Sequence, residues 1–175
     1  MTDRGWPTER QRDGGIDRIS LPPGVAGELR LSGKHAIGAG RFADPAAPWS
    51  TILCLCERFE LAPRYPAYVD WLDRSSQEQA LWHPIPDLHA PTLDDMTAVV
   101  RELADRVREG GSLLVHCAAG MGRTGMTAVC LLVTLGLDGS EALERVDRER
   151  PGAGPQTIEQ EELVREFVAA ERMER

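Results

Sequence analysis

LLVHCAAGMGRTGMTAVCLLV, residues 113–133, joins a short apolar run to a longer one through a loop rich in glycine and alanine. The first run has the length and composition of a buried strand, and the second is long enough to form a helix. The sequence therefore predicts a strand, a tight loop and a helix in succession. This arrangement is typical of folds that alternate strands and helices around a parallel sheet.

Patterns of the same kind continue on both sides of this stretch. Residues 50–56, STILCLC, have the composition of a strand buried on both faces. Apolar residues at helical spacing follow Thr92, a suitable N-cap, and stop at Gly110. The other expected elements are a strand hairpin between Ile16 and Ile37, a short strand at 80–85, and helices at 65–74, from Ser140 and from Thr157. This alternation predicts an α/β fold whose central, mostly parallel sheet carries helices on both faces.

The overall composition fits one globular domain. The chain has 175 residues, of which 42% are hydrophobic and 27% charged. Residues 1–15 are polar and are expected to form a flexible tail, which leaves residues 16–175 as the domain. A net charge of −8 disfavours binding to nucleic acid or to an anionic membrane. Because we find neither a secretory signal nor an apolar run of about 18 residues, we expect a cytoplasmic protein without membrane contact.

The loop from Cys117 to Arg123 has the composition of an anion-binding site. Small residues let successive backbone N–H groups point into one concavity, and the following helix adds the positive end of its dipole. Thiols at helix N-termini ionise at pKa values of roughly 3.5–7.5 rather than about 8.5. We therefore expect Cys117 to be a thiolate nucleophile beside a bound phosphoryl group. The expected phosphate-binding residues are Ala118, Ala119, Gly120, Met121, Gly122 and Arg123.

Three neighbours of Cys117 have expected supporting roles. Arg123 can grip two phosphoryl oxygens with its planar guanidinium and stabilise the transition state. Thr124 can donate its hydroxyl to the cysteine sulfur, which would ease departure of the thiolate when the phosphoenzyme is hydrolysed. His116 is expected to position the loop. A cysteine before a helix can also be a plain core residue, but the full Cys-x5-Arg-Thr string between a strand and a helix favours catalysis.

A leaving alkoxide or phenoxide needs a proton, and Asp87 is the candidate general acid. It lies in a proline-punctuated loop, HPIPDLHAPT at residues 83–92, which follows a predicted strand where α/β folds place their ligand sites. Asp94 and Asp95 are alternative acids, although a helix first turn already explains them. Both histidines of the loop lack the company of other metal-ligand residues, so we expect no metal and no cofactor.

The string HCAAGMGRTG, residues 116–125, resembles the signature of the protein tyrosine phosphatase superfamily. HPIPD, the helix after APTLDDM, the apolar helix after the signature and RPGAGPQTIEQ extend the resemblance from about Ile16 to Phe167. In order and spacing they are similar to phosphatases of the kinase-associated type (cyclin-dependent kinase inhibitor 3), within the dual-specificity group. The resemblance implies the three-layer fold of these enzymes, a two-step reaction through phosphocysteine, and the role of acid for Asp87.

The resemblance also implies roles for residues outside the loop. Relatives often use a glutamine after the penultimate helix to orient the attacking water, and Gln160 matches it best, with Gln156 as the alternative. Some relatives protect an oxidised nucleophile through a disulfide with a cysteine of the strand at 50–56. Cys54 and Cys56 are therefore candidate redox partners of Cys117, although buried strand residues are the simpler interpretation.

The favoured function is hydrolysis of a phosphorylated protein or peptide, with phosphotyrosine preferred and phosphoserine or phosphothreonine also open. Phosphoinositide-selective relatives carry lysines inside the loop, whereas Ala118, Ala119 and Met121 stand here, which weakens an inositol-phosphate or lipid substrate. The other alternative is a phosphate-binding module without turnover. The presence of the nucleophile Cys117, of Arg123 and of the acid Asp87 argues against it. Sulfur transfer or arsenate reduction would need no separate acid loop. The physiological substrate, the regulation and the oligomeric state stay open.

Overall fold

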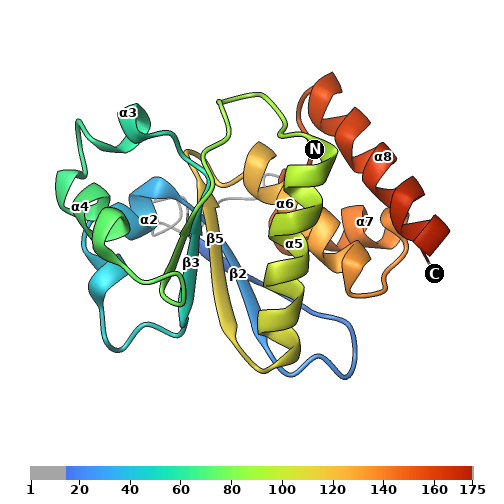
Figure 1. The fold of residues 1–175 in the computed structure, drawn as a ribbon, viewed down its shortest axis with the longest axis horizontal. Coiled ribbons are helices and arrows are strands. Elements are labelled where there is room, and N and C mark those ends of the chain that lie inside the picture. Colours follow the sequence, from blue (N-terminus) through green and yellow to red (C-terminus); the bar gives the residue numbers. More distant parts are fainter. Residues whose placement is uncertain (1–14, 175) are drawn as a thin grey trace, which may run out of the picture.

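The computed structural model describes residues 15–174, so the tail expected at residues 1–15 lies outside it except for Gly15. The described residues form five strands, seven α-helices and one 3₁₀ helix (Figure 1). The strands are β1 (Ile16–Ile19), β2 (Glu28–Gly33), β3 (Thr51–Cys54), β4 (Ala80–Trp82) and β5 (Ser112–Cys117). The helices are α2 (Lys34–Gly38), η1 (Arg41–Ala43), α3 (Arg58–Leu61), α4 (Pro66–Arg74), α5 (Leu93–Arg108), α6 (Gly122–Thr134), α7 (Gly139–Glu149) and α8 (Ile158–Glu174). None of the helices in this part of the chain has the length and apolarity to cross a bilayer.

The sheet has the strand order β1-β2-β5-β3-β4. The pairs β2–β5, β5–β3 and β3–β4 are parallel, which confirms the predicted mostly parallel sheet. β1 runs antiparallel to β2 as the expected hairpin at the edge of the sheet. The prediction that strand continues to Ile37 is wrong, because Lys34–Gly38 turns into the short helix α2 and buries Ile37.

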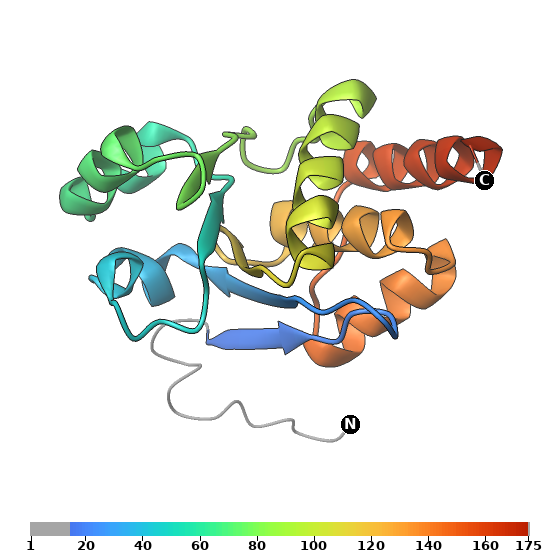
Figure 2. The same cartoon turned by 60° about the horizontal axis from the view of Figure 1, so that its bottom comes forward.

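Two hydrophobic clusters cover the two faces of the sheet. One contains the inner sides of α5, α6, α7 and α8, together with Leu53 and Val115 of the central strands. The other contains residues of α2, α3 and α4, together with Ile52 and Leu114 of the same strands. β3 and β5 contribute residues to both clusters because successive side chains of a strand point to opposite faces of the sheet. Figure 2 shows the two helical groups on either side of the sheet, which confirms the predicted three layers.

Helices α5 and α6 position the functional loops. Thr92 Oγ1 caps α5 by accepting a hydrogen bond from the Asp95 backbone N–H at 3.2 Å, as the sequence predicts. Every residue of α6 from Gly122 to Val133 is buried. The start of α6 is therefore fixed by packing all round, directly after the end of β5.

Candidate active site

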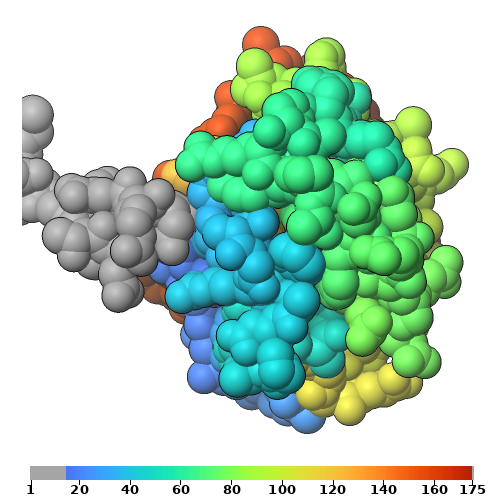
Figure 3. All heavy atoms as spheres, turned by 90° about the vertical axis from the view of Figure 1, so that its left-hand side faces the viewer, coloured from blue at the N-terminus to red at the C-terminus, as the bar shows by residue number. Residues whose placement is uncertain are grey.

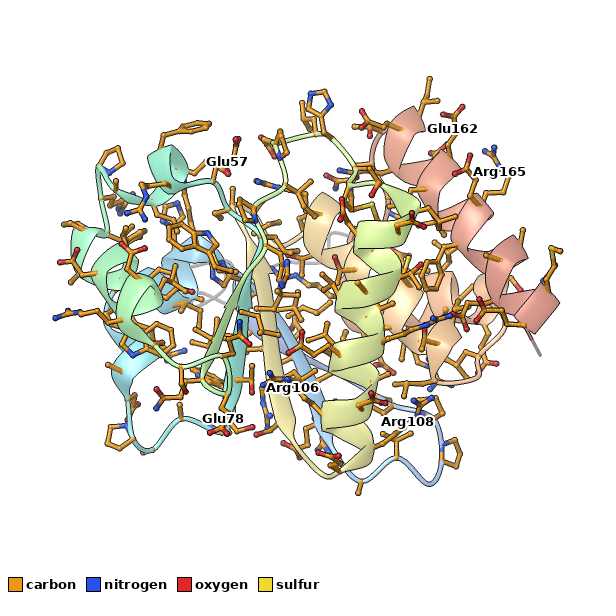
Figure 4. The ribbon with its side chains drawn as sticks, in the orientation of Figure 1. Glu57, Glu78, Arg106, Arg108, Glu162 and Arg165 are labelled. Atoms are coloured by element: carbon orange, nitrogen blue, oxygen red, sulfur yellow. The ribbon has the colours of Figure 1, made fainter. Side chains whose placement is uncertain are left out.

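The loop between β5 and α6 lies at the carboxyl edge of the parallel strands, which is the upper edge in Figure 1. The 83–92 segment and the first turn of α8 follow the same edge. Figure 4 shows Glu57 and Glu162 toward this edge, whereas Glu78, Arg106 and Arg108 lie at the opposite end of the sheet. The elements that carry the predicted site residues therefore meet at one edge.

Four successive carbonyls of the loop are held by hydrogen bonds on its outer side. The donors are the backbone N–H groups of Lys34 and Gly125 and the guanidinium of Arg150, at 2.7–3.2 Å. Across a trans peptide the next N–H points opposite to the carbonyl, so these N–H groups face the inside of the loop. This is the arrangement that an oxyanion needs. The carbonyls belong to Ala118, Ala119, Gly120 and Met121.

The sulfur of Cys117 is buried at the start of this loop and accepts a hydrogen bond from the Gly120 N–H at 3.2 Å. Gly120 has a φ of +73°, and a Cβ atom there would lie 2.2 Å from the Ser32 carbonyl oxygen, so the position requires glycine. The expected hydrogen bond from Thr124 to the sulfur is not formed. The Thr124 hydroxyl lies in the first turn of α6 and is buried without a hydrogen-bond partner among the described residues. The sulfur accepts its hydrogen bond from the loop backbone instead.

Arg123 joins the loop to two carboxylates. Its Nη1 and Nη2 each donate to a Glu60 oxygen at 2.8 Å, and Nη2 also lies 2.9 Å from Asp87 Oδ1. Its side chain is only 1% exposed, and Nη1 also donates to the Ile85 carbonyl at 2.8 Å. Burial lowers the pKa of Arg123, but the hydrogen bond to Glu60 and the charges of Cys117 and Glu60 outweigh burial and raise it. A fixed positive charge therefore lies beside Cys117.

Glu60 is a site residue that the sequence predictions miss. It lies in α3, where Glu57 and Glu60 form a capping box, a pattern of two glutamates three residues apart that was available in the sequence. Burial raises the pKa of Glu60, but hydrogen bonds from Arg123 and the Glu57 N–H, with the charges of Arg123 and Lys34, outweigh burial and lower it. Glu60 thus holds the orientation of Arg123 as a carboxylate.

Asp87 reaches the site from the 83–92 loop, and 63% of its side chain is exposed on the solvent side of Arg123. The next residue, Leu88, has a φ of +66°. Thr157 Oγ1 donates to the Leu88 carbonyl at 3.0 Å and thereby ties this loop to the start of α8. The alternative acids Asp94 and Asp95 lie instead in the first turn of α5, as the helix dipole favours.

The structure brings both candidate glutamines to the loop. A Cβ atom on Gly122 would lie 3.0 Å from Gln160 Oε1 and 3.1 Å from Gln156 Oε1. Gln160 is buried, its Oε1 accepts from the Gln156 N–H at 2.9 Å, and its Nε2 donates to the His89 carbonyl at 3.0 Å. The contact between Gln160 and the acid loop links these two parts of the site.

Arg150 is the second functional residue that the sequence predictions miss. It is buried beneath the loop, where Nε donates to the Gly120 carbonyl at 2.7 Å and Nη2 to the Ala119 carbonyl at 3.2 Å. Its Nη1 forms an ion pair with Asp17 of β1 at 2.6 Å. Burial lowers the pKa of Arg150, and the charge of Cys117 opposes this effect. The RPGAG string resembles the family pattern, but the string alone does not indicate that Arg150 binds the carbonyls of the β5–α6 loop.

His116 points away from the nucleophile and its Nε2 lies 2.7 Å from the Tyr68 hydroxyl, beneath α4. Cys54 and Cys56 pack in the same cluster as Tyr68, whereas Cys117 packs in the cluster of α6. Cys54 at the end of β3, and Cys56 just after it, therefore pack on the opposite face of the sheet from Cys117. A disulfide with Cys117 stays a prediction, and it would require one partner to pass from one face to the other.

Cys54, Cys56 and His116 also form a compact group of metal-binding types, with their ligand atoms within 4.8 Å of one another. A hydrogen bond with Cys54, followed by burial, raises the pKa of the Cys56 thiol. This effect favours the protonated thiol of Cys56. The absence of a metal from the reaction stays a prediction from the sequence.

A family model described as PTP-SAK, a Swiss Army Knife protein with a DSP-PTPase phosphatase domain, matches residues 46–170. Cyclin-dependent kinase inhibitor 3 of Homo sapiens is 29% identical over 119 residues, which cover 66% of this chain and 56% of the relative. Its counterpart in Rattus norvegicus is 32% identical over 87 residues, which cover 49% of this chain and 41% of the relative. The chain spans about half the length of the curated relatives that it matches.

Two solved structures resemble the whole architecture. Tk-PTP in its active form has 28% sequence identity and a TM-score of 0.65, over 87% of this chain and 97% of that one. Kinase-associated phosphatase with its catalytic-site cysteine replaced by serine has 23% identity and a TM-score of 0.70, over 89% and 96% of the two chains. The second likeness concerns the fold alone, and it confirms the expected three-layer class.

Proposed function

Since the chain belongs to the PTP-SAK family of DSP-PTPase phosphatase domains, within the cysteine-based protein tyrosine phosphatase superfamily, we propose that it dephosphorylates proteins without a metal. Phosphotyrosine is the preferred substrate in this proposal, and phosphoserine or phosphothreonine a secondary one. The observation that carries it is the convergence on one loop of a buried thiol, inward N–H groups, an oriented arginine and an exposed carboxyl.

The reaction has two steps. The Cys117 thiolate attacks phosphorus and forms the S–P bond while the P–O bond to the substrate breaks, and Asp87 gives its proton to the leaving oxygen. Arg123 and the loop N–H groups bind the three equatorial oxygens and stabilise their charge. Asp87 then accepts a proton from a water held by Gln160 or Gln156, and this water releases phosphate from the sulfur. The 2.9 Å contact between Asp87 and Arg123 supports this assignment, because it puts the acid at the edge of the phosphate position.

Replacement of the nucleophile tests the mechanism. Para-nitrophenyl phosphate should be hydrolysed in the presence of EDTA, and Cys117→Ser should reduce the rate to background, since a serine hydroxyl is not ionised at neutral pH. Cys130→Ser, which changes a buried cysteine in the middle of α6, is the matched control and should keep the activity. Activity that persists in Cys117→Ser, or that EDTA abolishes, would contradict the proposal.

The acid is tested by the leaving group. Asp87→Asn should slow turnover of alkyl and phenyl phosphates by about 10²–10⁴, the usual contribution of a general acid. Para-nitrophenyl phosphate should lose far less, because nitrophenolate leaves without a proton. Asp94→Asn changes the alternative acid on α5 and should show no such dependence. Equal losses of Asp87→Asn on all leaving groups would assign Asp87 another role.

A further inference from the structure

The mouth of the site carries large apolar side chains that face solvent. Phe59, Leu88 and Ile158 are 68%, 60% and 75% exposed. Only two other large hydrophobic side chains of the described residues are exposed, Leu143 on α7 and Met173 in the last turn of α8. Among the described residues, three of the five exposed large apolar side chains therefore lie beside the phosphate loop.

Each of the three lies next to a residue that builds the site. Phe59 directly precedes Glu60, and Leu88 directly follows Asp87. In each pair the two Cα atoms are about 3.8 Å apart, and both carboxylates bind Arg123. Ile158 follows Thr157, whose hydroxyl binds the Leu88 carbonyl. The three come from α3, the 83–92 loop and α8, which line the upper edge in Figure 1. α3 also stands at the top of the face drawn in Figure 3.

The backbone of Leu88 indicates that its side chain is used. Its φ of +66° is the one positive value of a non-glycine residue in the described part of the chain. Glycine or asparagine would adopt this conformation at a lower cost than leucine. An exposed leucine contributes little to the core, so neither packing nor backbone preference explains it. Strained residues of this kind are typical of ligand-contacting loops.

Three charged side chains around the mouth are already bound to partners within the protein. Arg58 forms two hydrogen bonds with Asp73, at 2.6 and 3.0 Å, and His89 lies 2.9 Å from Glu159. Glu60 is bound to Arg123. Beside Phe59 runs an open groove lined by Glu57, Arg58, Phe59, Ala62, Trp82 and Pro84. Apolar surface is therefore what the mouth offers to the part of a substrate outside the phosphate loop.

We propose that Phe59, Leu88 and Ile158, here called the apolar rim, select phosphorylated peptide segments that carry apolar side chains next to the phosphorylated residue. The inference rests on the proposed phosphoprotein phosphatase function and adds its substrate class. Each rim side chain loses contact with water when it packs on an apolar neighbour of the phosphoresidue, and the hydrophobic effect favours that burial. One methylene group in an enclosed hydrophobic pocket changes selectivity by about 10- to 200-fold, and we expect the lower end of that range for contacts on an open rim.

The test compares two phosphotyrosine peptides of equal length and charge, with leucine or with serine at the positions that flank the phosphotyrosine. For the wild-type protein, kcat/KM should be at least about tenfold higher for the leucine peptide. Phe59→Ser, Leu88→Gly and Ile158→Ser should each lower this ratio, and the triple variant should bring it to about one. Because partial unfolding would lower kcat/KM for both peptides by the same factor, a lost preference in these variants cannot come from unfolding. Met173→Ser, which changes an even more exposed side chain at the far end of α8, should keep the wild-type ratio.

A wild-type ratio near one, or a ratio that falls equally in Met173→Ser, would overturn the apolar rim while leaving phosphopeptide hydrolysis intact. Failure to hydrolyse either peptide, with para-nitrophenyl phosphate still turned over, would overturn the proposed protein substrate itself. A third arm uses phosphatidylinositol phosphate in phosphatidylcholine vesicles and its soluble headgroup. Preferential hydrolysis in the vesicle that depends on the rim would assign these residues to a membrane surface and overturn the peptide proposal.

Discussion

Arg150 is a buried, charged residue outside the β5–α6 loop that donates hydrogen bonds to the carbonyls of that loop. Its side chain satisfies two loop carbonyls and Asp17, so a shorter or neutral side chain leaves these groups without donors. We expect Arg150→Lys to weaken inhibition by vanadate about tenfold or more, because one ammonium cannot replace a planar fork with several donors. Vanadate inhibition and substrate KM measure the effect, since both depend on the shape of the loop.

Asp17→Asn is the companion variant for Arg150→Lys, because it keeps an oxygen acceptor for Arg150 and removes only the charge. It should change vanadate binding less than Arg150→Lys does. Arg172→Lys alters an exposed arginine that binds Asp138, far from the loop, and should leave vanadate inhibition unchanged. Unaltered vanadate binding in Arg150→Lys would mean that the loop keeps its shape without these hydrogen bonds.

Glu60 links the site to the pH dependence of stability. Its pKa in the folded protein lies below the usual value of 4.5, so its ion pair stabilises the fold above that pH and is lost as the pH falls through the lowered pKa. Between pH 7 and pH 4, urea unfolding should show a smaller loss of stability in Glu60→Gln than in the wild type. Glu162→Gln, at an exposed position on α8, should follow the wild-type profile. Parallel profiles of Glu60→Gln and the wild type would contradict this account.

At the residue scale, local strings were enough to place Cys117, Arg123 and Asp87, which the structure brings together. The roles of Glu60 and Arg150 were not predicted, because their contacts join residues that are distant in the sequence. Glu60 lies 63 residues from Arg123, and Arg150 lies 133 residues from Asp17. An ion pair between distant residues leaves no spacing to detect in one sequence. The hydrogen bond expected from Thr124 to the Cys117 sulfur failed for a different reason. The sequence shows that a hydroxyl donor is present, but it does not show in which direction the hydroxyl points.

At the level of single elements, the β5–α6 loop depends on close contact with β2. We expect Gly120→Ala to abolish phosphatase activity and to lower the free energy of unfolding by about 3 kcal/mol, because its Cβ would lie 2.2 Å from the Ser32 carbonyl oxygen at a φ of +73°. Gly136 has a φ of +110° and no atom within 4 Å of such a Cβ. Gly136→Ala should therefore cost only about 1 kcal/mol and keep the activity. Urea unfolding and para-nitrophenyl phosphate turnover measure both, and equal effects of the two substitutions would refute the steric explanation.

The elements that could be predicted are those with a long period or an explicit cap. α5 has sixteen residues, with Thr92 before it and Gly110 after it, and the prediction matches its bounds closely. α3 has four residues and α2 has five, which is too short to show a helical period. Their sequences therefore looked like loop and strand. The stretch that these two helices occupy is also where Glu60 was missed.

The whole molecule has one sheet with a cluster on each face, and this predicts a single cooperative unfolding transition. Phe167 is buried in the cluster of α5–α8, and Phe167→Ala should destabilise the protein by about 3–5 kcal/mol. Three tryptophans pack instead against the opposite cluster, so their fluorescence reports on the other face. They are Trp49, Trp71 and Trp82.

In a Trp6→Phe background, Phe167→Ala should shift the urea midpoints of fluorescence and far-UV circular dichroism by the same amount. Trp6 lies outside the described residues, and its replacement restricts the fluorescence signal to the three tryptophans of the second cluster. A fluorescence midpoint that stays in place while the circular dichroism midpoint moves would mean that the two faces unfold separately.

The fold class was predictable because strands and helices alternate along the chain and both kinds of apolar pattern are strong. The sequence does not tell which strand pairs with which, and the order β1-β2-β5-β3-β4 comes from the structure alone. The placement of Cys54 and Cys117 on different faces follows from that order and from the register of β3 against β5. The disulfide that the resemblance implies would therefore have to join cysteines from opposite faces, which only the strand pairing shows.

The bond between Arg150 and Asp17 also bears on when the protein becomes active during its synthesis. Asp17 is made early and Arg150 follows 133 residues later. A chain that grows by about 5–20 residues per second takes on the order of ten seconds to cover that distance. Cys117 is translated 33 residues before Arg150. In this last part of the interval the carbonyls of Ala119 and Gly120 still lack their donor. We therefore expect the nascent chain to acquire its phosphate cradle only after Arg150 has been translated, and shorter nascent chains to be inactive.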